Sequence, residues 1–157
     1  MKTHSWKYYA GWILAAEAVG GLSGWLTREG TSLYAETVTK PPLSPPGIVF
    51  PIVWVILYAL MGIGAARVQM SPPSLARTRG LILFCVQLVF NFFWSIFFFN
   101  LQAFGFALVW LIALWLLILA MTLQFRRADK AAAVLQIPYL LWVAFAGYLN
   151  AGVWFLN

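Results

Sequence analysis

The chain has 157 residues, of which 63% are hydrophobic and 9% are charged, and its net charge is +6 at neutral pH. The positive charge does not indicate nucleic-acid binding, because the basic residues lie before and between long apolar stretches. Five such stretches take up nearly the whole length and leave no room for a soluble domain. We therefore predict an all-α membrane protein, a single five-transmembrane-helix bundle over residues 1–157, with spans of about 8–26, 48–68, 81–99, 103–125 and 131–155.

The first stretch contains Glu17, one turn before the small-residue pair Gly20 and Gly24. A carboxyl group inside a span is expected to face the bundle interior or a wet cavity, although a protonated Glu bonded to a neighbour is an alternative. The glycine pair predicts close approach of another helix. Residues 16–18 also resemble a signal-peptide cleavage site, which would leave four spans. The apolar run continues to Leu26, which favours an uncleaved span.

Residues 27–47 form the long connection between the first two spans. Its prolines predict an extended, stiff path that cannot lie in a helix interior. Such a segment is either a lid over the bundle or a stiff linker, and the residues alone leave both open. Ser44, followed by Pro45, predicts the N-cap and first turn of the second span.

Helical spacing groups aromatic and polar side chains on one face of three later spans. These faces carry Phe50, Trp54, Tyr58 and Met61 in the second span, Gln87, Asn91, Trp94 and Phe98 in the third, and Trp142, Ala146 and Asn150 in the fifth. Converging faces of this kind would form an apolar pocket with a few orienting polar groups, and ordinary packing is equally compatible with the pattern.

Three further features shape the last three spans. The third and fourth spans are joined by little more than residues 100–102, which predicts an antiparallel hairpin. Pro138 predicts a kink in the fifth span. Cys85, in the middle of the third span, is expected to be a buried, unreactive thiol, and a single cysteine excludes an intramolecular disulfide.

Basic residues gather on one side of the predicted membrane topology. With five spans, one side holds Lys2, Lys7, Arg67, Arg77, Arg79, Arg126, Arg127 and Lys130, and the other holds Arg28 and Lys40. The positive-inside rule then places the N-terminus in the cytoplasm and the C-terminus outside, with a bacterial inner membrane favoured. The basic loops are expected to meet anionic lipid head groups.

Few residues in the sequence suit catalysis. The single histidine, His4, precedes the first span, and Glu29, Glu36 and Asp129 lie outside the spans. This distribution disfavours hydrolytic or phosphoryl-transfer chemistry and predicts neither a metal site nor an obligatory cofactor.

Three sequence motifs together resemble one known family. Residues 40–62 read KPPLSPPGIVFPIVWVILYALMG, residues 87–94 read QLVFNFFW, and residues 138–150 read PYLLWVAFAGYLN. In this order they resemble the signatures of the TspO/MBR family, which includes tryptophan-rich sensory proteins and translocator proteins. The resemblance spans the chain and is specific.

The resemblance implies a five-helix bundle, commonly a homodimer, with a cavity under residues 27–47. It implies binding of porphyrins such as protoporphyrin IX and, in some members, of sterols and isoquinoline or benzodiazepine drugs. By position, the family's pocket residues are Trp54, Asn91, Trp94, Trp142 and Ala146, with Tyr34 and residues 41–46 as the lid and Tyr58 and Tyr139 as further candidates. The resemblance also implies an alternative activity, because some bacterial members of the family promote light-dependent breakdown of porphyrins. If this chain had that activity, Trp54 and Trp142 would be the reactive residues.

The chain departs from the family pattern at several positions. Leu43 stands where a tryptophan is usual, and Trp110 replaces a frequent aspartate. The sterol motif is incomplete after Tyr148, because no Lys or Arg follows, so sterol binding is less expected. We predict a membrane receptor or sensor that binds porphyrins, and the alternatives are a light-dependent porphyrin-degrading enzyme and a translocator.

Overall fold

The computed structural model describes residues 5–157, and every regular element in this range is a helix. Lys2 and His4, which the sequence analysis singled out, lie outside the described residues. The elements are α1 (Ser5–Leu26), α2 (Arg28–Thr37), α3 (Val49–Met70), α4 (Leu75–Ser95), the π-helix η1 (Ile96–Asn100), α5 (Phe104–Ala128), α6 (Lys130–Val134) and α7 (Ile137–Leu156).

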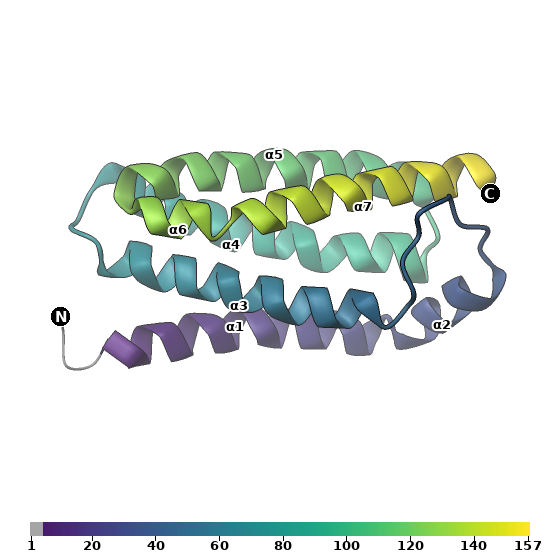
Figure 1. Ribbon diagram of the computed structural model, residues 1–157, viewed down its shortest axis with the longest axis horizontal. Helices are drawn as coiled ribbons and strands as arrows, with labels where there is room; N and C mark the ends of the chain where they lie inside the picture. The colour runs from purple at the N-terminus through teal and green to yellow at the C-terminus, as the bar shows by residue number, and fades with distance from the viewer. Residues whose placement is uncertain (1–4) are drawn as a thin grey trace.

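The long helices lie side by side along the long axis of an elongated bundle (Figure 1). Helix α1 packs along α3, α4 forms the predicted hairpin with α5, and α5 packs along α7. Because the chain runs the length of the bundle an odd number of times, its described start and its C-terminus lie at opposite ends. The short helix α2 lies across the end at which α1 finishes.

Four helical segments are long and apolar enough to cross a membrane: Val49–Met70, Leu75–Asn100, Phe104–Ala128 and Lys130–Leu156. They match four of the five predicted spans and mark an integral membrane protein. Helix α1 has a comparable length of 22 residues but is not among the four. The charge of Glu17, together with several glycines and aromatic residues, lowers its mean hydropathy. The fifth crossing therefore stays a prediction.

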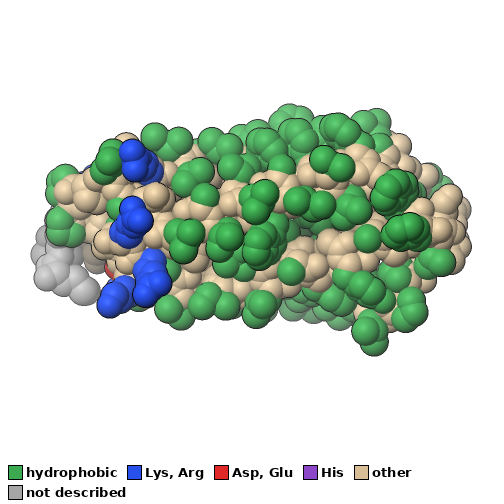
Figure 2. All heavy atoms as spheres, turned by 90° about the horizontal axis from the view of Figure 1, so that it is seen from above, with side chains coloured by type: hydrophobic (Ala, Val, Ile, Leu, Met, Phe, Trp, Pro, Cys, Tyr) green, Lys and Arg blue, Asp and Glu red, His purple; other side chains and the backbone are tan. Residues whose placement is uncertain are grey.

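The surface of the bundle is divided between apolar flanks and one basic end. On the face that Figure 2 shows, hydrophobic side chains are spread along the length of the bundle, and the Lys and Arg side chains gather at one end. That end is where α3 and α5 finish and α4 and α6 begin, and it carries Arg67, Arg77, Arg79, Arg126, Arg127 and Lys130. The clustering agrees with the predicted charge asymmetry.

The segment after α1 is not the uniformly extended connection that the prolines suggested. Residues 28–37 form α2, and extended backbone begins only at Val38. Pro41 disfavours helical backbone at Lys40, because a proline restricts the residue before it. The prediction was therefore correct for the second half of the segment and wrong for the first.

The predicted N-cap at Ser44 was wrong. The Ser44 hydroxyl donates to the carbonyl of Pro41 at 2.8 Å, and α3 begins only at Val49. Pro46 explains the delay, because it pushes Pro45 out of the helical region, and a first turn starting there cannot form. Pro51 lies in the first turn of α3, where proline is tolerated.

The predicted kink at Pro138 is a short turn between two helices. Helix α6 ends at Val134, Leu135 and Gln136 form a turn with helical backbone angles, and Pro138 lies in the first turn of α7. Proline has no N–H to donate to the carbonyl four residues earlier, which here belongs to Val134. The turn between the helices therefore falls just before the proline.

The expectation of a buried Cys85 was wrong. The thiol is exposed on the outer face of α4, beside the exposed side chains of Ile82, Val86 and Val89. Gln87 and Asn91 face the interior on the opposite side of the same helix. Cys85 therefore belongs to the apolar flank of the bundle.

Candidate functional site

A cavity of about 920 Å³ lies at the end of the bundle away from the basic cluster. Its wall is formed by the second half of α1, helix α2, residues 40–47, and parts of α3, α4 and α7. The wall is mostly apolar. Its size falls within the roughly 300–1,000 Å³ that is usual for small-molecule sites.

Six of the eight ligand-site residues predicted from the sequence line this cavity. They are Tyr34, Trp54, Tyr58, Trp94, Trp142 and Ala146. The other two, Asn91 and Tyr139, are buried behind the wall and do not line it. The faces of α3, α4 and α7 that helical spacing identified therefore converge.

The three tryptophans of the wall differ in how they are held. Trp94 is buried, donates its indole N–H to Asn150 Oδ1 at 3.1 Å, and stacks on Phe98. Trp54 and Trp142 are only half-buried, and neither indole N–H bonds to another residue in the range 5–157. These two tryptophans line the cavity with indole N–H groups that have no partner among the described residues.

A chain of buried polar side chains lies directly behind the wall. The Tyr58 hydroxyl donates to Asn91 Oδ1 at 2.6 Å, and Asn91 Nδ2 donates to the Tyr139 hydroxyl at 2.7 Å. Tyr139 in turn donates to Gln87 Oε1 at 2.7 Å. Asn91 thus uses both of its amide atoms within the protein, and it positions Tyr58 rather than reaching the cavity.

Gln87 and Asn150 contribute to the site more than the sequence analysis assigned to them. Gln87 ends the polar chain behind the wall, and Asn150 holds Trp94 while donating to the carbonyl of Phe104 at 2.8 Å. Both lie on the faces that spacing had identified. The signal that could have marked them is an amide side chain within an otherwise apolar span, where an unpaired polar group is costly.

The α2 segment and the prolines cover one side of the cavity. The Tyr34 ring packs against Phe98 and Phe99, with ring centroids 5.3 Å apart in each pair, and burial raises the pKa of the Tyr34 hydroxyl. The Tyr148 hydroxyl donates to the carbonyl of Pro42 at 2.6 Å, which ties the extended residues to α7. The covering segment is therefore packed in place at two points.

Leu43, which stands where the family usually has tryptophan, does not line the cavity. Its backbone adopts a φ of 71°, and its side chain is 82% exposed. A positive φ is uncommon for a residue with a branched side chain. The covering segment therefore offers no aromatic contact at this position.

Charged groups occur at three places on the cavity wall. Glu17 of α1 lines it, beside Gly20 and Gly21. Arg28 lies over the ring of Trp25, and Lys40 donates to three carbonyls that include those of Tyr34 and Val38. These bonds satisfy the ammonium hydrogens of Lys40 but leave its positive charge without a carboxylate partner among the described residues.

Close packing at Gly20 shapes the wall. A side chain at this position would overlap the ring of Tyr58, so the glycine allows the ring to pack closely against α1. Gly24, one turn later, has open space around it and contributes room to the cavity instead. The two glycines of the predicted pair therefore serve different purposes.

Comparisons with known proteins agree on one family. The sequence model of the TspO/MBR family matches residues 12–155. The tryptophan-rich protein TspO of Chlorobaculum tepidum is 39% identical over 141 residues, which are 89% of each chain. Protein CrtK of Rhodobacter capsulatus is 34% identical over 89% of this chain and 87% of its own. The translocator protein of Bos taurus is 34% identical over 95% of this chain and 89% of its own.

Proposed function

This chain belongs to the TspO/MBR family, and we propose that it is a membrane receptor or sensor that binds a flat, largely apolar tetrapyrrole such as protoporphyrin IX in the Trp54–Trp94–Trp142 cavity. The observation that carries the proposal is the convergence of three tryptophans from three helices on one cavity of about 920 Å³. Flat macrocycles gain from such surfaces through burial and ring stacking.

The wall provides both apolar area and a few polar groups. Trp54 and Trp142 supply aromatic side chains to the wall, while the buried Tyr58–Asn91–Tyr139 chain fixes one side of the cavity. A wall held in this way is organised before a ligand arrives, which lowers the entropy lost on binding.

We also propose that α1 crosses the membrane together with the four apolar segments, and that the basic end faces the cytoplasm. Helix α1 is 22 residues long, as is α3, along which it packs. Its one acidic residue, Glu17, faces the cavity rather than the flank. The clustered Lys and Arg side chains support the orientation.

Replacement of Trp142 tests the proposed cavity. We expect Trp142→Ala to weaken protoporphyrin IX binding more than Trp142→Phe, because phenylalanine keeps a ring in the site. The stacking part alone corresponds to about 2- to 13-fold in Kd. The measurement is a titration that follows the absorbance band of the porphyrin, so that loss of a tryptophan does not reduce the signal.

The control for this titration is Trp6→Phe, because Trp6 is exposed and lies in the first turns of α1, far from the cavity wall. It should bind porphyrin as the unaltered protein does. Equal affinities for Trp142→Ala and the unaltered protein would exclude this cavity as the porphyrin site.

Lys40 is expected to orient the ligand by attracting its carboxylates. We predict that protoporphyrin IX binds more tightly than its dimethyl ester, by up to about fivefold for a partly exposed charge pair. Lys40→Gln should remove this preference while its amide keeps donors for the α2 carbonyls. Lys130→Gln, at the opposite end of the bundle, is the matched control. The measurement is the Kd of protoporphyrin IX and of its dimethyl ester for each of the two variants. A preference that survives in Lys40→Gln would rule out this role.

A further inference from the structure

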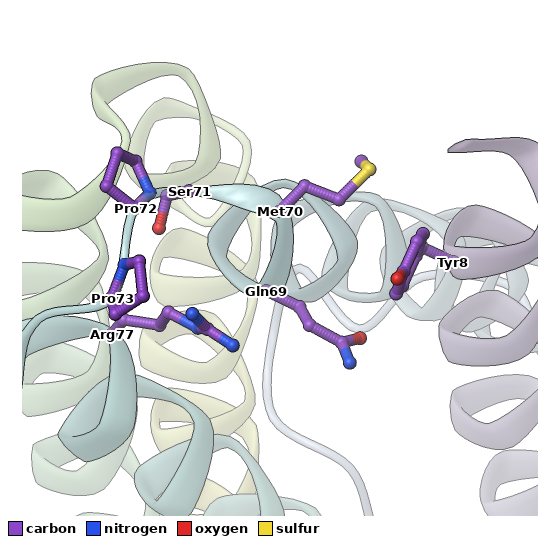
Figure 3. A pocket seen from close by; sticks show the side chains of 7 residues that line it. All are labelled: Tyr8, Gln69, Met70, Ser71, Pro72, Pro73 and Arg77. Atoms are coloured by element: carbon purple, nitrogen blue, oxygen red, sulfur yellow. The ribbon is translucent and has the colours of Figure 1, made fainter. Parts of the chain in front are cut away.

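A second, smaller hollow lies at the basic end of the bundle, about 330 Å³ in volume. It is bounded by the start of α1, the end of α3 and the connection to α4 (Figure 3). Its lining residues are Tyr8, Gln69, Met70, Ser71, Pro72, Pro73 and Arg77. None of them belongs to the tryptophan-lined cavity.

The polar groups of this hollow are mainly hydrogen-bond donors. Arg77 and Gln69 extend into the gap that Tyr8 closes from the side of α1 (Figure 3). Gln69 Oε1 accepts a bond from the indole N–H of Trp12, which leaves the amide nitrogen of Gln69 available. Neither the guanidinium of Arg77 nor the hydroxyl of Tyr8 bonds to another residue of the described range.

No carboxylate of residues 5–157 lines the hollow, so among these residues its positive charge is uncompensated. Asp129, an acidic residue at this end, pairs with Arg67 at 3.2 Å and accepts from the first N–H groups of α6. Lys7, next to Tyr8, and Arg79, two residues after Arg77, add positive charge near the hollow. A guanidinium, an amide N–H and a phenol around one gap form a recognition site for a phosphate oxygen.

The depth of the hollow indicates which phosphate it suits. The hollow lies where the apolar segment Val49–Met70 ends and the apolar segment Leu75–Asn100 begins. When these segments span a bilayer, their ends lie at the level of the lipid head groups. Exposed apolar side chains lie on the two helices that flank it, among them Leu14 of α1 and Leu75 and Ile82 of α4. These would face the acyl chains of a lipid and would be of no use to a free inorganic anion.

We propose that this hollow binds the head group of an anionic phospholipid. The phosphodiester lies against Arg77, with the Gln69 amide and the Tyr8 hydroxyl as further donors, and the acyl chains follow the apolar flank. This site is independent of the tetrapyrrole proposal, because the two hollows share no residue.

The test compares lipid retention in three proteins that are each reconstituted in nanodiscs of equal parts phosphatidylglycerol and phosphatidylcholine. The lipids that remain bound after extraction are identified by native mass spectrometry. The unaltered protein should retain phosphatidylglycerol preferentially, and Arg77→Gln should lower this preference about fivefold. Arg127→Gln, at the same end but outside the hollow, should keep it.

Two further measurements decide between the remaining outcomes. Tyr8→Phe, which removes one donor without a charge, should lower the preference by a smaller factor and leave the melting temperature unchanged. Glycerol phosphate added at millimolar concentration should not displace the retained lipid. Equal retention in Arg77→Gln and Arg127→Gln would overturn the site, and displacement by glycerol phosphate would overturn its assignment to a lipid.

Discussion

Gly62→Ala should lower the apparent melting temperature of the protein by about 6–12 °C, because α1 and α3 touch at this residue. A methyl group at position 62 would lie 2.5 Å from Ile13 Cα and 2.6 Å from Ile13 N, both of which are backbone atoms. Backbone cannot rotate aside as a side chain can, so the two helices must separate. We expect a cost of about 3 kcal/mol, at the upper end of the range for overpacking.

Gly11→Ala is the matched control for this substitution. It adds the same methyl group to α1, at a position with nothing within 4 Å. Alanine is the better helix former, so the melting temperature should stay the same or rise. Thermal unfolding followed by circular dichroism in the same detergent measures both variants. Equal melting temperatures would show that α1 is not packed against α3 as the structure places it.

Asn91→Leu should destabilise the protein while leaving its porphyrin affinity within about twofold. Leucine fills a similar space but leaves the hydroxyl of Tyr58 without its acceptor, which lies 2.6 Å away in the native protein. An unpaired buried donor costs about 1–3 kcal/mol. Trp142→Ala, by contrast, should weaken porphyrin binding, because it removes a side chain that lines the cavity.

A double-mutant cycle with Tyr58→Phe isolates the interaction itself. The Asn91→Leu, Tyr58→Phe double variant should lose less stability than the two single variants together. Coupling energies between polar side chains in membrane bundles average about 0.6 kcal/mol and reach about 1.7 kcal/mol. Additive losses would mean that the two side chains do not interact. Lost affinity without lost stability would place Asn91 in the cavity.

The helical faces of the cavity could be predicted from the sequence because they depend on local geometry. Residues three and four apart share a face whatever the helix packs against, so the positions of Trp54 and Tyr58 or of Trp142 and Ala146 follow from spacing. Spacing does not show whether a side chain ends in a cavity or at a neighbouring helix. Asn91 reaches Tyr139, 48 residues away, and only the packed bundle decides that choice.

Helix α2 was missed because its stability comes from contacts outside its own sequence. A ten-residue helix is marginal by itself. Here Tyr34 packs against Phe98 and Phe99, and Gly30 lies against the backbone of Phe99 and the side chain of Asn100. These contacts join residues about 70 positions apart, so no local pattern in the sequence reports them.

Cys85 was misplaced for a different reason. The burial preference of cysteine comes from proteins in water, where the apolar side of a helix faces inward. In a membrane bundle the outer surface is apolar as well, as the exposed Ile82 and Val86 beside Cys85 demonstrate. Polarity then marks the interior, and Gln87 and Asn91 were the informative residues of this helix.

The turn between α6 and α7 is where the rotation of α7 about its own axis is set relative to α3. Each residue of a continuous helix advances the next by about 100° around the axis, so any twist at Lys130 would carry through to Trp142. Leu135 and Gln136 keep helical backbone angles, but the N–H of Gln136 bonds to Ala133, three residues earlier, instead of four. Gln136 Nε2 donates to the carbonyl of Leu60 at 3.3 Å, which fixes the phase of α7 against α3. The bond from Gln136 therefore links the azimuth at which Trp142 meets the cavity to the position of α3.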